Sequence, residues 1–332
     1  MMIRFATIGS NFIVHSFLDA LCEVAGAKFD AVYSRDYDNG RTLADKYGAS
    51  KVYTNLDELA SDDAIDAVYI ASPNSLHFEQ SLLMLQAGKH VLCEKPIASN
   101  MCEFAQMMKV ANDNGVILLE AMKNVYCPGF FAVWDNLVKL GVIRNVIFNF
   151  SQYSSRYDKF KDGIIENAFN PEFSNGSLMD IGVYCIHLLL ALFGEPNKVN
   201  SSAIKLSNGI DGAGTILCEY DGFLSTLVYS KIANSHIPSE IQGENATMII
   251  DKISNIEHVS ICYNNGRRDE IVIEKNHTMS YEIEKFLTLI ANYDKNTDYN
   301  LISMKQMKFL DTVRGQLGIV FPADKGFQIS VL

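Results

Sequence analysis

Residues 3–14, which read IRFATIGSNFIV, decide the fold of the first half of the chain. The apolar run 3–8 predicts a strand, and Gly9 permits a tight turn into a helix predicted over 11–24. A dinucleotide-binding fold carries its G-x-G-x-x-G loop at this first turn, but here Asn11 and Val14 replace the second and third glycines. Asn11 tolerates positive φ, so a pyrophosphate could still approach the backbone of residues 10–13. A glycine that simply ends a strand is the alternative interpretation.

Short apolar runs continue to alternate with amphipathic stretches as far as residue 119. Strands are predicted over 29–33, 52–53, 67–71, 91–93 and 116–119, and helices over 41–47, 55–59, 75–85 and 100–111. Strands that alternate with helices in this way indicate a parallel sheet with helices on both faces. The sequence therefore predicts an α/β, doubly wound Rossmann domain over residues 1–121.

The pattern changes in the second part of the chain. Helices are predicted over 128–140, 178–193, 281–292 and 303–317, a loop over 154–175, and strands over 145–153, 215–220, 223–230, 240–242, 246–250, 258–263 and 270–273. Turn signals at Asp221-Gly222 and Asn264-Asn265-Gly266 join consecutive strands, which favours antiparallel pairing. We expect residues 122–332 to form an α+β domain with an open, mainly antiparallel sheet. Its C-terminal helices are candidates to pack back on the first domain.

The composition excludes several classes of function. The chain has 28 Lys and Arg against 39 Asp and Glu, and this net charge of −11 argues against nucleic acid or an anionic membrane as a partner. The seven cysteines form no C-x-x-C pair, the N-terminus lacks a signal-peptide pattern, and the longest apolar run, near Leu188–Phe193, is too short to span a membrane. These features predict a cytoplasmic protein. The seven histidines show no metal-ligand spacing, so no metal is expected.

The end of the second predicted strand bears on which dinucleotide is bound. An NAD enzyme usually carries an acidic residue there, which bonds to the ribose 2′-hydroxyl. Here the strand is followed by Ser34 and Arg35, a hydroxyl and a guanidinium suited to a 2′-phosphate. We therefore expect NADP(H) to be favoured over NAD(H). A surface role for Arg35, or a ribose contact by Asp36, is the alternative.

Two further segments carry candidate catalytic groups. Lys95 follows the strand 91–93 directly, at the sheet edge where open α/β sheets bind ligands, although a lone loop lysine is more often a solvated charge. Asp180, Tyr184 and His187 are the polar exceptions on the otherwise apolar helix 178–193, and their spacing places them on one helix face. Buried polar groups need partners, so an internal hydrogen-bond network is the alternative to an active-site wall.

The motifs Glu94-Lys95-Pro96 and GSLMDIGVY at 176–184 resemble those of the glucose–fructose oxidoreductase / inositol dehydrogenase / MocA (Gfo/Idh/MocA) family. Ala71-Ser72-Pro73-Asn74 with His77 and Glu120-Ala121-Met122 add to the likeness, which extends over the whole chain. The tyrosine at 184 is most similar to the dihydrodiol dehydrogenase-like branch. The resemblance implies NAD(P)-dependent oxidoreduction of sugars, polyols or related carbonyls, with catalytic roles for Lys95, Asp180 and Tyr184. It also implies homodimers or homotetramers that form through the C-terminal sheet.

The predicted site combines these residues. Tyr184 could exchange the substrate hydroxyl proton if a nearby cation such as Lys95 favoured its ionised form, and Asp180 would orient the substrate or Lys95. The expected cofactor-binding residues are Gly9, Ser10, Asn11, Phe12, Ile13, Ser34, Arg35, Ser72, Pro73, Asn74, His77, Glu94 and Lys95, and the expected substrate contacts are Lys123, Asn124, Asp180 and His187. For His187 a core histidine is an equal alternative. A non-catalytic NAD(P)-binding sensor is the competing function, since the glycine motif is incomplete.

Overall fold

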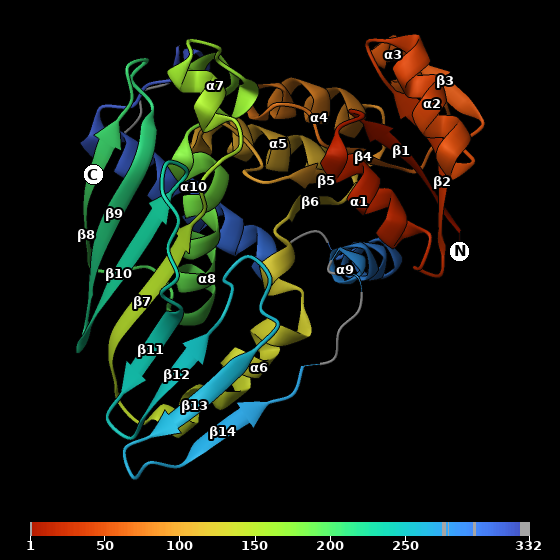
Figure 1. Cartoon of the computed structure of the whole chain (residues 1–332). Coiled ribbons are helices and arrows are strands. Elements are labelled where there is room, and N and C mark those ends of the chain that lie inside the picture. The colour runs from red at the N-terminus through yellow and green to blue at the C-terminus, as the bar shows by residue number, and fades with distance from the viewer. Residues whose placement is uncertain (1, 274–276, 278, 295–296, 326–332) are drawn as a thin grey trace. The chain divides into compact units, whose positions relative to one another are not determined.

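The computed structural model describes residues 2–273, 277, 279–294 and 297–325, and the chain divides into two compact units (Figure 1). The first unit comprises Met1–Met122 and Asn276–Met304, and the second comprises Lys123–Lys275 and Lys305–Leu332. Each unit therefore contains two separate stretches of the chain, and the long helix α10 (Asp298–Leu317) contributes to both. The division into folding domains at 1–121 and 122–332 stays a prediction.

The first unit is built on a six-stranded parallel sheet with the strand order β3-β2-β1-β4-β5-β6. Its strands are β1 (Ile3–Ile8), β2 (Ala27–Tyr33), β3 (Lys51–Tyr53), β4 (Ala67–Ile70), β5 (His90–Glu94) and β6 (Leu118–Ala121). Its other helices are α1 (Phe12–Leu21), α2 (Tyr37–Tyr47), α3 (Leu56–Ala60), α4 (His77–Gln86), α5 (Met101–Asn114) and α9 (Ser280–Asn292). The order reverses between β1 and β4, which is the switch point where doubly wound sheets bind ligands. The predicted Rossmann fold is confirmed.

Aromatic side chains from distant parts of the sequence form the core of the first unit. Phe5 of β1 lies 6.0 Å from Phe17 of α1 and 6.1 Å from Phe286 of α9, measured between ring centres. Phe17 also stacks on Tyr69 of β4 at 3.7 Å. Helix α9 is thus part of the core around β1, although it follows β1 by more than 270 residues.

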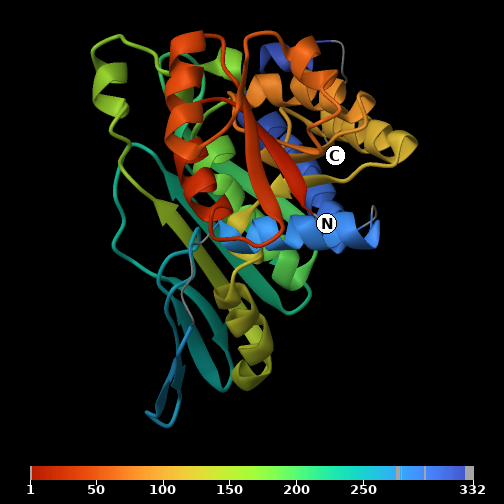
Figure 2. The same cartoon turned by 90° about the vertical axis from the view of Figure 1, so that its right-hand side faces the viewer.

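The second unit is built on an eight-stranded sheet with the order β14-β13-β12-β11-β7-β10-β9-β8. Its strands are β7 (Ile143–Ser151), β8 (Lys198–Lys205), β9 (Asp211–Tyr220), β10 (Phe223–Ser230), β11 (Ser239–Gly243), β12 (Ala246–Ile250), β13 (Val259–Tyr263) and β14 (Arg268–Ile271). The β13–β14 hairpin ends the sheet at the bottom of Figure 2. The expected, mainly antiparallel sheet is confirmed, and it contains one parallel pair, between β10 and β7. The long connection through α8 and two further strands brings β10 back beside β7 in the same direction.

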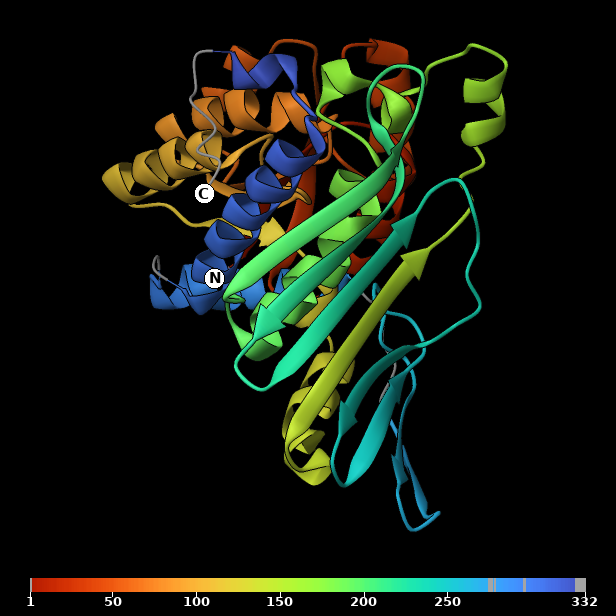
Figure 3. The same ribbon diagram turned by 90° about the vertical axis from the view of Figure 1, so that its left-hand side faces the viewer.

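The helices of the second unit leave one face of this sheet open. Helices α6 (Pro128–Asn136) and α8 (Val183–Phe193) pack on one face, whereas α7 (Tyr157–Lys161) lies in the segment predicted as a loop. Figure 3 shows the opposite face, where no described helix covers β7 to β10. Ile204, Leu217 and Leu224 are 61%, 38% and 48% exposed on these strands.

The segment around α8 differs from its prediction in two ways. A single helix is expected over 178–193, but its first turn, Leu178–Gly182, is a π-helix, in which the Val183 N–H donates to the Leu178 carbonyl. Together with the preceding residues, Pro171–Phe193 is long and apolar enough to cross a membrane, which corrects the estimate based on the run at 188–193 alone. Of its most apolar window, 83% is buried inside the structure, as in the core helix of a globular protein, so this is weak evidence for a span.

Candidate active site

The first strand-to-helix turn lies at the switch point between β1 and β4. Gly9 has φ +115°, and a Cβ atom on it would lie 3.0 Å from the carbonyl oxygen of Ala71, just after β4. Val14 is fully buried, and its side chain lies 3.7 Å from the same Cβ position, as expected of a helix–sheet packing residue. The only glycine that remains from the motif is therefore at the position where the backbone requires one.

Asn11 acts differently from the expectation. Its φ of −80° is extended backbone, so its tolerance of positive φ is not used. Instead its side-chain oxygen caps α1 by accepting the N–H groups of Ile13 (3.1 Å) and Val14 (3.4 Å), and its amide nitrogen donates to Ala71 O at 2.9 Å. Because Asn11 occupies these two N–H groups, a pyrophosphate would depend more on the backbone of Ser10 and Phe12.

The three residues after β2, Ser34, Arg35 and Asp36, differ in burial and in their contacts. Asp36 caps α2, since its carboxylate accepts the N–H of Asn39 at 3.0 Å. This cap explains why α2 begins at Tyr37, four residues before its predicted start. Ser34 is buried and accepts the N–H of Asp36 at 3.3 Å, while Arg35 is exposed. The carboxylate is thus engaged in the helix cap and the guanidinium is accessible, which favours a 2′-phosphate over a ribose hydroxyl.

The turn that carries Lys95 follows β5 and is held by buried side chains. Glu94 accepts a 2.6 Å hydrogen bond from the hydroxyl of Tyr69, and the backbone N–H of Ile97 donates to Glu120 at 3.0 Å. Glu120 is fully buried and also accepts the hydroxyl of Ser303 at 2.6 Å. Lys95 itself is half-buried, and its peptide bond to Pro96 is cis.

His77 connects this turn to the loop after β4. Its two ring nitrogens each lie 2.9 Å from a backbone carbonyl oxygen, one of Pro96 and one of Ser72. Burial lowers the pKa of His77 to about 4, with Lys95 adding to the effect, so the ring is neutral at pH 7. A neutral ring donates to one of the two carbonyls at a time. The predicted cofactor residues Ser72, Pro73 and Asn74 therefore lie in a loop tied to the Lys95 turn.

In the second unit the three polar residues of the α8 segment have partners on three different elements. Asp180 forms an ion pair with Lys231 at the end of β10. The ring of Tyr184 lies edge-on to Phe150 of β7 at 5.6 Å and is 8% exposed. His187 is buried, and its Nδ1 lies 2.5 Å from Oε1 of Gln306, which accepts a hydrogen bond from the ring N–H. The π-turn changes the angle between Asp180 and Tyr184 from that of a regular α-helix.

The expected substrate residues differ in burial and in their contacts. The burial of His187 is that of a core histidine, and burial lowers its pKa to about 4. Asn124 is 1% exposed, and its amide donates to the Ile253 carbonyl at 3.1 Å and to that of Tyr184 at 3.5 Å. Lys123 is half-buried. Asn124 thus supports the Tyr184 backbone, and its burial argues against a place at the mouth of a cleft. Substrate contacts by Lys123 and Asp180 stay predictions.

Two charged residues near Asp180 are absent from the predicted site. Lys231 follows directly on β10, and its only sequence signal is a charge after a strand predicted to end at Ser230. Asp211 begins β9 and is fully buried, where its carboxylate accepts the N–H of Leu178 at 2.6 Å. Burial raises the pKa of Asp211 to about 6. The strand containing Asp211 is predicted only from residue 215, so this residue carries no signal.

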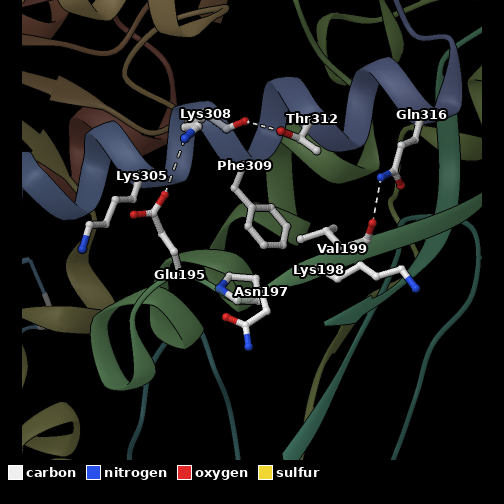
Figure 4. A pocket seen from close by; sticks show the side chains of 10 residues that line it. Glu195, Asn197, Lys198, Val199, Lys305, Lys308, Phe309, Thr312 and Gln316 are labelled. Atoms are coloured by element: carbon white, nitrogen blue, oxygen red, sulfur yellow. Dashed lines mark hydrogen bonds and ion pairs between the residues drawn. The ribbon is translucent and has the colours of Figure 1, made fainter. Parts of the chain in front are cut away.

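A separate pocket lies on the second unit between α10 and the start of β8 (Figure 4). Lys308 faces Glu195 at 4.0 Å, and Gln316 donates to the Val199 carbonyl at 2.8 Å. Its lining residues form a different set from the predicted site. Within the residues that the structure describes, no group of three or more His, Cys, Asp or Glu side chains is arranged to hold a metal ion.

Comparison with protein families gives two matches along the chain. Residues 3–122 match the model of an oxidoreductase family with an NAD-binding Rossmann fold (GFO_IDH_MocA), and residues 138–249 match the GFO/IDH/MocA C-terminal domain. The two matched regions correspond to the parallel sheet of the first unit and to most of the mixed sheet of the second.

Individual proteins show the same likeness over nearly full length. The scyllo-inositol 2-dehydrogenase (NADP(+)) of Bacillus subtilis (strain 168) is 46% identical over 98% of this chain and 100% of its own. The trans-1,2-dihydrobenzene-1,2-diol dehydrogenase of Mus musculus is 26% identical over 98% of this chain and 100% of its own. Among solved structures, a 3-ketoreductase from Actinomadura kijaniata in complex with NADP and TDP-benzene has a TM-score of 0.87 at 22% identity, covering 95% of this chain and 98% of that one.

Proposed function

Because the chain belongs to the Gfo/Idh/MocA oxidoreductase family, as its motifs suggest, we propose that it is an NADP-dependent dehydrogenase or reductase of a polyol or sugar-like substrate. The observation that carries the proposal is the Lys95 turn, which lies at the carboxyl edge of a doubly wound sheet and is linked through His77 to the loop of the predicted cofactor residues. The 46% identity to an NADP-dependent inositol dehydrogenase over the whole chain supports the substrate class.

The residues present fit a dinucleotide with a 2′-phosphate. Gly9 lets the chain pass close to the Ala71 carbonyl at the switch point, where a pyrophosphate would meet the backbone of Ser10 and Phe12. The exposed Arg35 and the Ser34 hydroxyl would bind the 2′-phosphate, while Asp36 is engaged as a helix cap. Ser72, Pro73, Asn74 and Glu94 would line the nicotinamide end. When bound, the cofactor supplies or accepts a hydride.

The reaction then needs a group that exchanges the proton of the substrate hydroxyl. We assign this role to Tyr184, whose phenol would donate its proton to the carbonyl oxygen in reduction and accept it back in oxidation. The Lys95 ammonium would polarise the carbonyl and stabilise negative charge on oxygen in the transition state. The part-exposed carboxylate of Asp180 would accept a hydrogen bond from a neighbouring substrate hydroxyl.

A substrate panel tests the proposal. Purified protein is mixed with NADP and inositols, other polyols and aldoses in turn, and with NADPH and the corresponding ketones, while the cofactor absorbance is followed. We expect turnover with at least one cyclic polyol or its ketone. Tight NADPH binding without turnover of any compound in the panel would contradict the proposed enzyme and would support a non-catalytic NAD(P)-binding sensor.

We propose, too, that the protein is cytoplasmic and forms homodimers or homotetramers through the open face of the second sheet. The exposed Ile204, Leu217 and Leu224 on that face support the interface. Light scattering of the wild type and of Leu217→Asp tests it. We expect a dimer or tetramer that the substitution dissociates, and a monomeric wild type would contradict the interface.

A further inference from the structure

Lys231 is a buried cation next to the segment that carries Asp180 and Tyr184. Its backbone N–H donates to the Gly212 carbonyl at 2.9 Å, which fixes the base of the side chain. The side chain is only 5% exposed, and its ammonium lies 5.1 Å from the centre of the Phe169 ring. Such a position is costly for an ammonium unless a counter-charge is held close to it.

Asp180 supplies that counter-charge. Its Oδ2 is within hydrogen-bond distance of the Lys231 ammonium, yet 32% of the Asp180 side chain is exposed. The pair therefore combines a buried cation with an anion that a ligand can reach. An ionised carboxylate only accepts hydrogen bonds, so the group suits the hydroxyls of a neutral polyol.

The backbone on which Asp180 sits is fixed from the other side by Asp211. The carboxylate of Asp211 accepts the N–H of Leu178 at 2.6 Å, and a Cβ atom at Gly176 would collide with Oδ1 of Asp211. The Lys231 ammonium also favours the ionised form of Asp211. Lys231 thus acts on both carboxylates, one that holds the start of the π-turn and one that projects from it.

We propose that Lys231 is a positioning residue that fixes the Asp180 carboxylate as the hydrogen-bond acceptor for a substrate hydroxyl. This inference rests on the proposed function and deepens it. Lys231 acts through Asp180, because its own side chain is buried. Without the ammonium, the carboxylate can rotate and also protonates more readily, so the substrate loses a preformed contact.

Kinetics of Lys231→Met, Lys231→Arg and Asp180→Asn test the proposal. We expect Lys231→Met to lower kcat/KM about 10- to 100-fold, mainly through KM, because misplacing a positioning group costs up to about 10²-fold. The pH below which kcat/KM falls should rise, since a carboxylate loses its neighbouring cation. The affinity for NADPH should stay unchanged, and Lys231→Arg should restore part of kcat/KM.

The double variant Asp180→Asn/Lys231→Met keeps the test valid even if Lys231→Met alone is unstable, because it removes both charges of the ion pair, while Asp211 keeps its hydrogen bond from the Leu178 N–H. Its kcat/KM should lie within about threefold of that of Asp180→Asn, as expected for two residues that act as one unit. A much lower value would show that Lys231 acts independently of Asp180 and would overturn the proposal.

Lys198→Met is the matched control, since Lys198 forms an exposed ion pair with Glu219 at 3.1 Å in the same unit. It should leave kcat/KM and its pH profile unchanged. A Lys231→Met enzyme with wild-type KM and pH profile would overturn the inference alone. A wild type that turns over no polyol, sugar or ketone would overturn the proposed function and the inference together.

Discussion

The Lys95 turn of the first unit and the Asp180 segment of the second are held in place by different kinds of interaction. Buried side chains hold the Lys95 turn by hydrogen bonds to its backbone and to Glu94, through Tyr69, His77 and Glu120. The Asp180 segment has such a hydrogen bond too, from the Leu178 N–H to Asp211, and adds the ion pair between Lys231 and Asp180. Removing one partner of a hydrogen bond leaves a buried polar group unsatisfied, whereas removing one partner of the ion pair leaves a charge without its counter-charge.

The largest expected effect tests whether Lys95 and Tyr184 serve one reaction. Lys95→Met and Tyr184→Phe should each lower kcat about 10²- to 10⁴-fold, because each removes a positioned proton-transfer or charge-stabilising group. Residues that act as a unit are non-additive, so the double variant should be little worse than the poorer single variant. Lys109→Met, which breaks the exposed pair with Asp113, is the control for steady-state rates. Multiplicative losses in the double variant would assign the two residues to separate tasks.

The next effect is the pH dependence of stability that the buried Asp211 gives the second unit. Burial raises the pKa of Asp211 to about 6, so between pH 4 and 6 the folded protein binds more protons than the unfolded chain. Stability should therefore fall as the pH rises through this window, by at most about 3 kcal/mol from this carboxyl, at 1.36 kcal/mol per pKa unit. Asp211→Asn should remove this component. Urea unfolding of both proteins from pH 4 to pH 7 measures the difference, and parallel curves would contradict the assignment.

Glu120 provides the corresponding test in the first unit. Glu120→Ala leaves the buried N–H of Ile97 without its 3.0 Å acceptor, which should lower the free energy of unfolding by about 1–3 kcal/mol. Glu120→Gln keeps an acceptor oxygen and should lose less. Denaturant melts of both variants check this. If the glutamine variant were the less stable of the two, charge rather than hydrogen bonding would hold the turn.

The smallest effect concerns the cofactor. A hydrogen bond to a charged group contributes about 1.5–3 kcal/mol, and exposure of Arg35 places its effect at the lower end. NADPH should then bind about tenfold more tightly than NADH, and Arg35→Ala should remove most of that preference. Fluorescence titration of both cofactors against both proteins measures it. Equal affinities in the wild type would show that neither Ser34 nor Arg35 reads the 2′ position.

The sequence predicts the first unit better than the second because its signals are local. Gly9, the Asp36 region and the Glu94-Lys95-Pro96 motif each lie at the end of a strand with clear apolar periodicity. In the second unit, β8 is missed because its residues are mostly polar and at least partly exposed. Lys231 is missed because its partner Asp180 lies 51 positions earlier, and only the folded sheet brings them together. The π-turn at 178–182 has no local sequence signal.

The path of the chain through the two units has a consequence for how the protein is made. Phe286 of α9 packs on Phe5 of β1, so the core around the first strand is completed by a helix that is synthesised more than 270 residues later. A nascent chain that has emerged only as far as residue 122 exposes apolar surface around β1 that α9 later covers. Contacts between such distant residues slow folding, because a long loop must close first. The first sheet therefore emerges with apolar surface that stays uncovered until α9 has been synthesised.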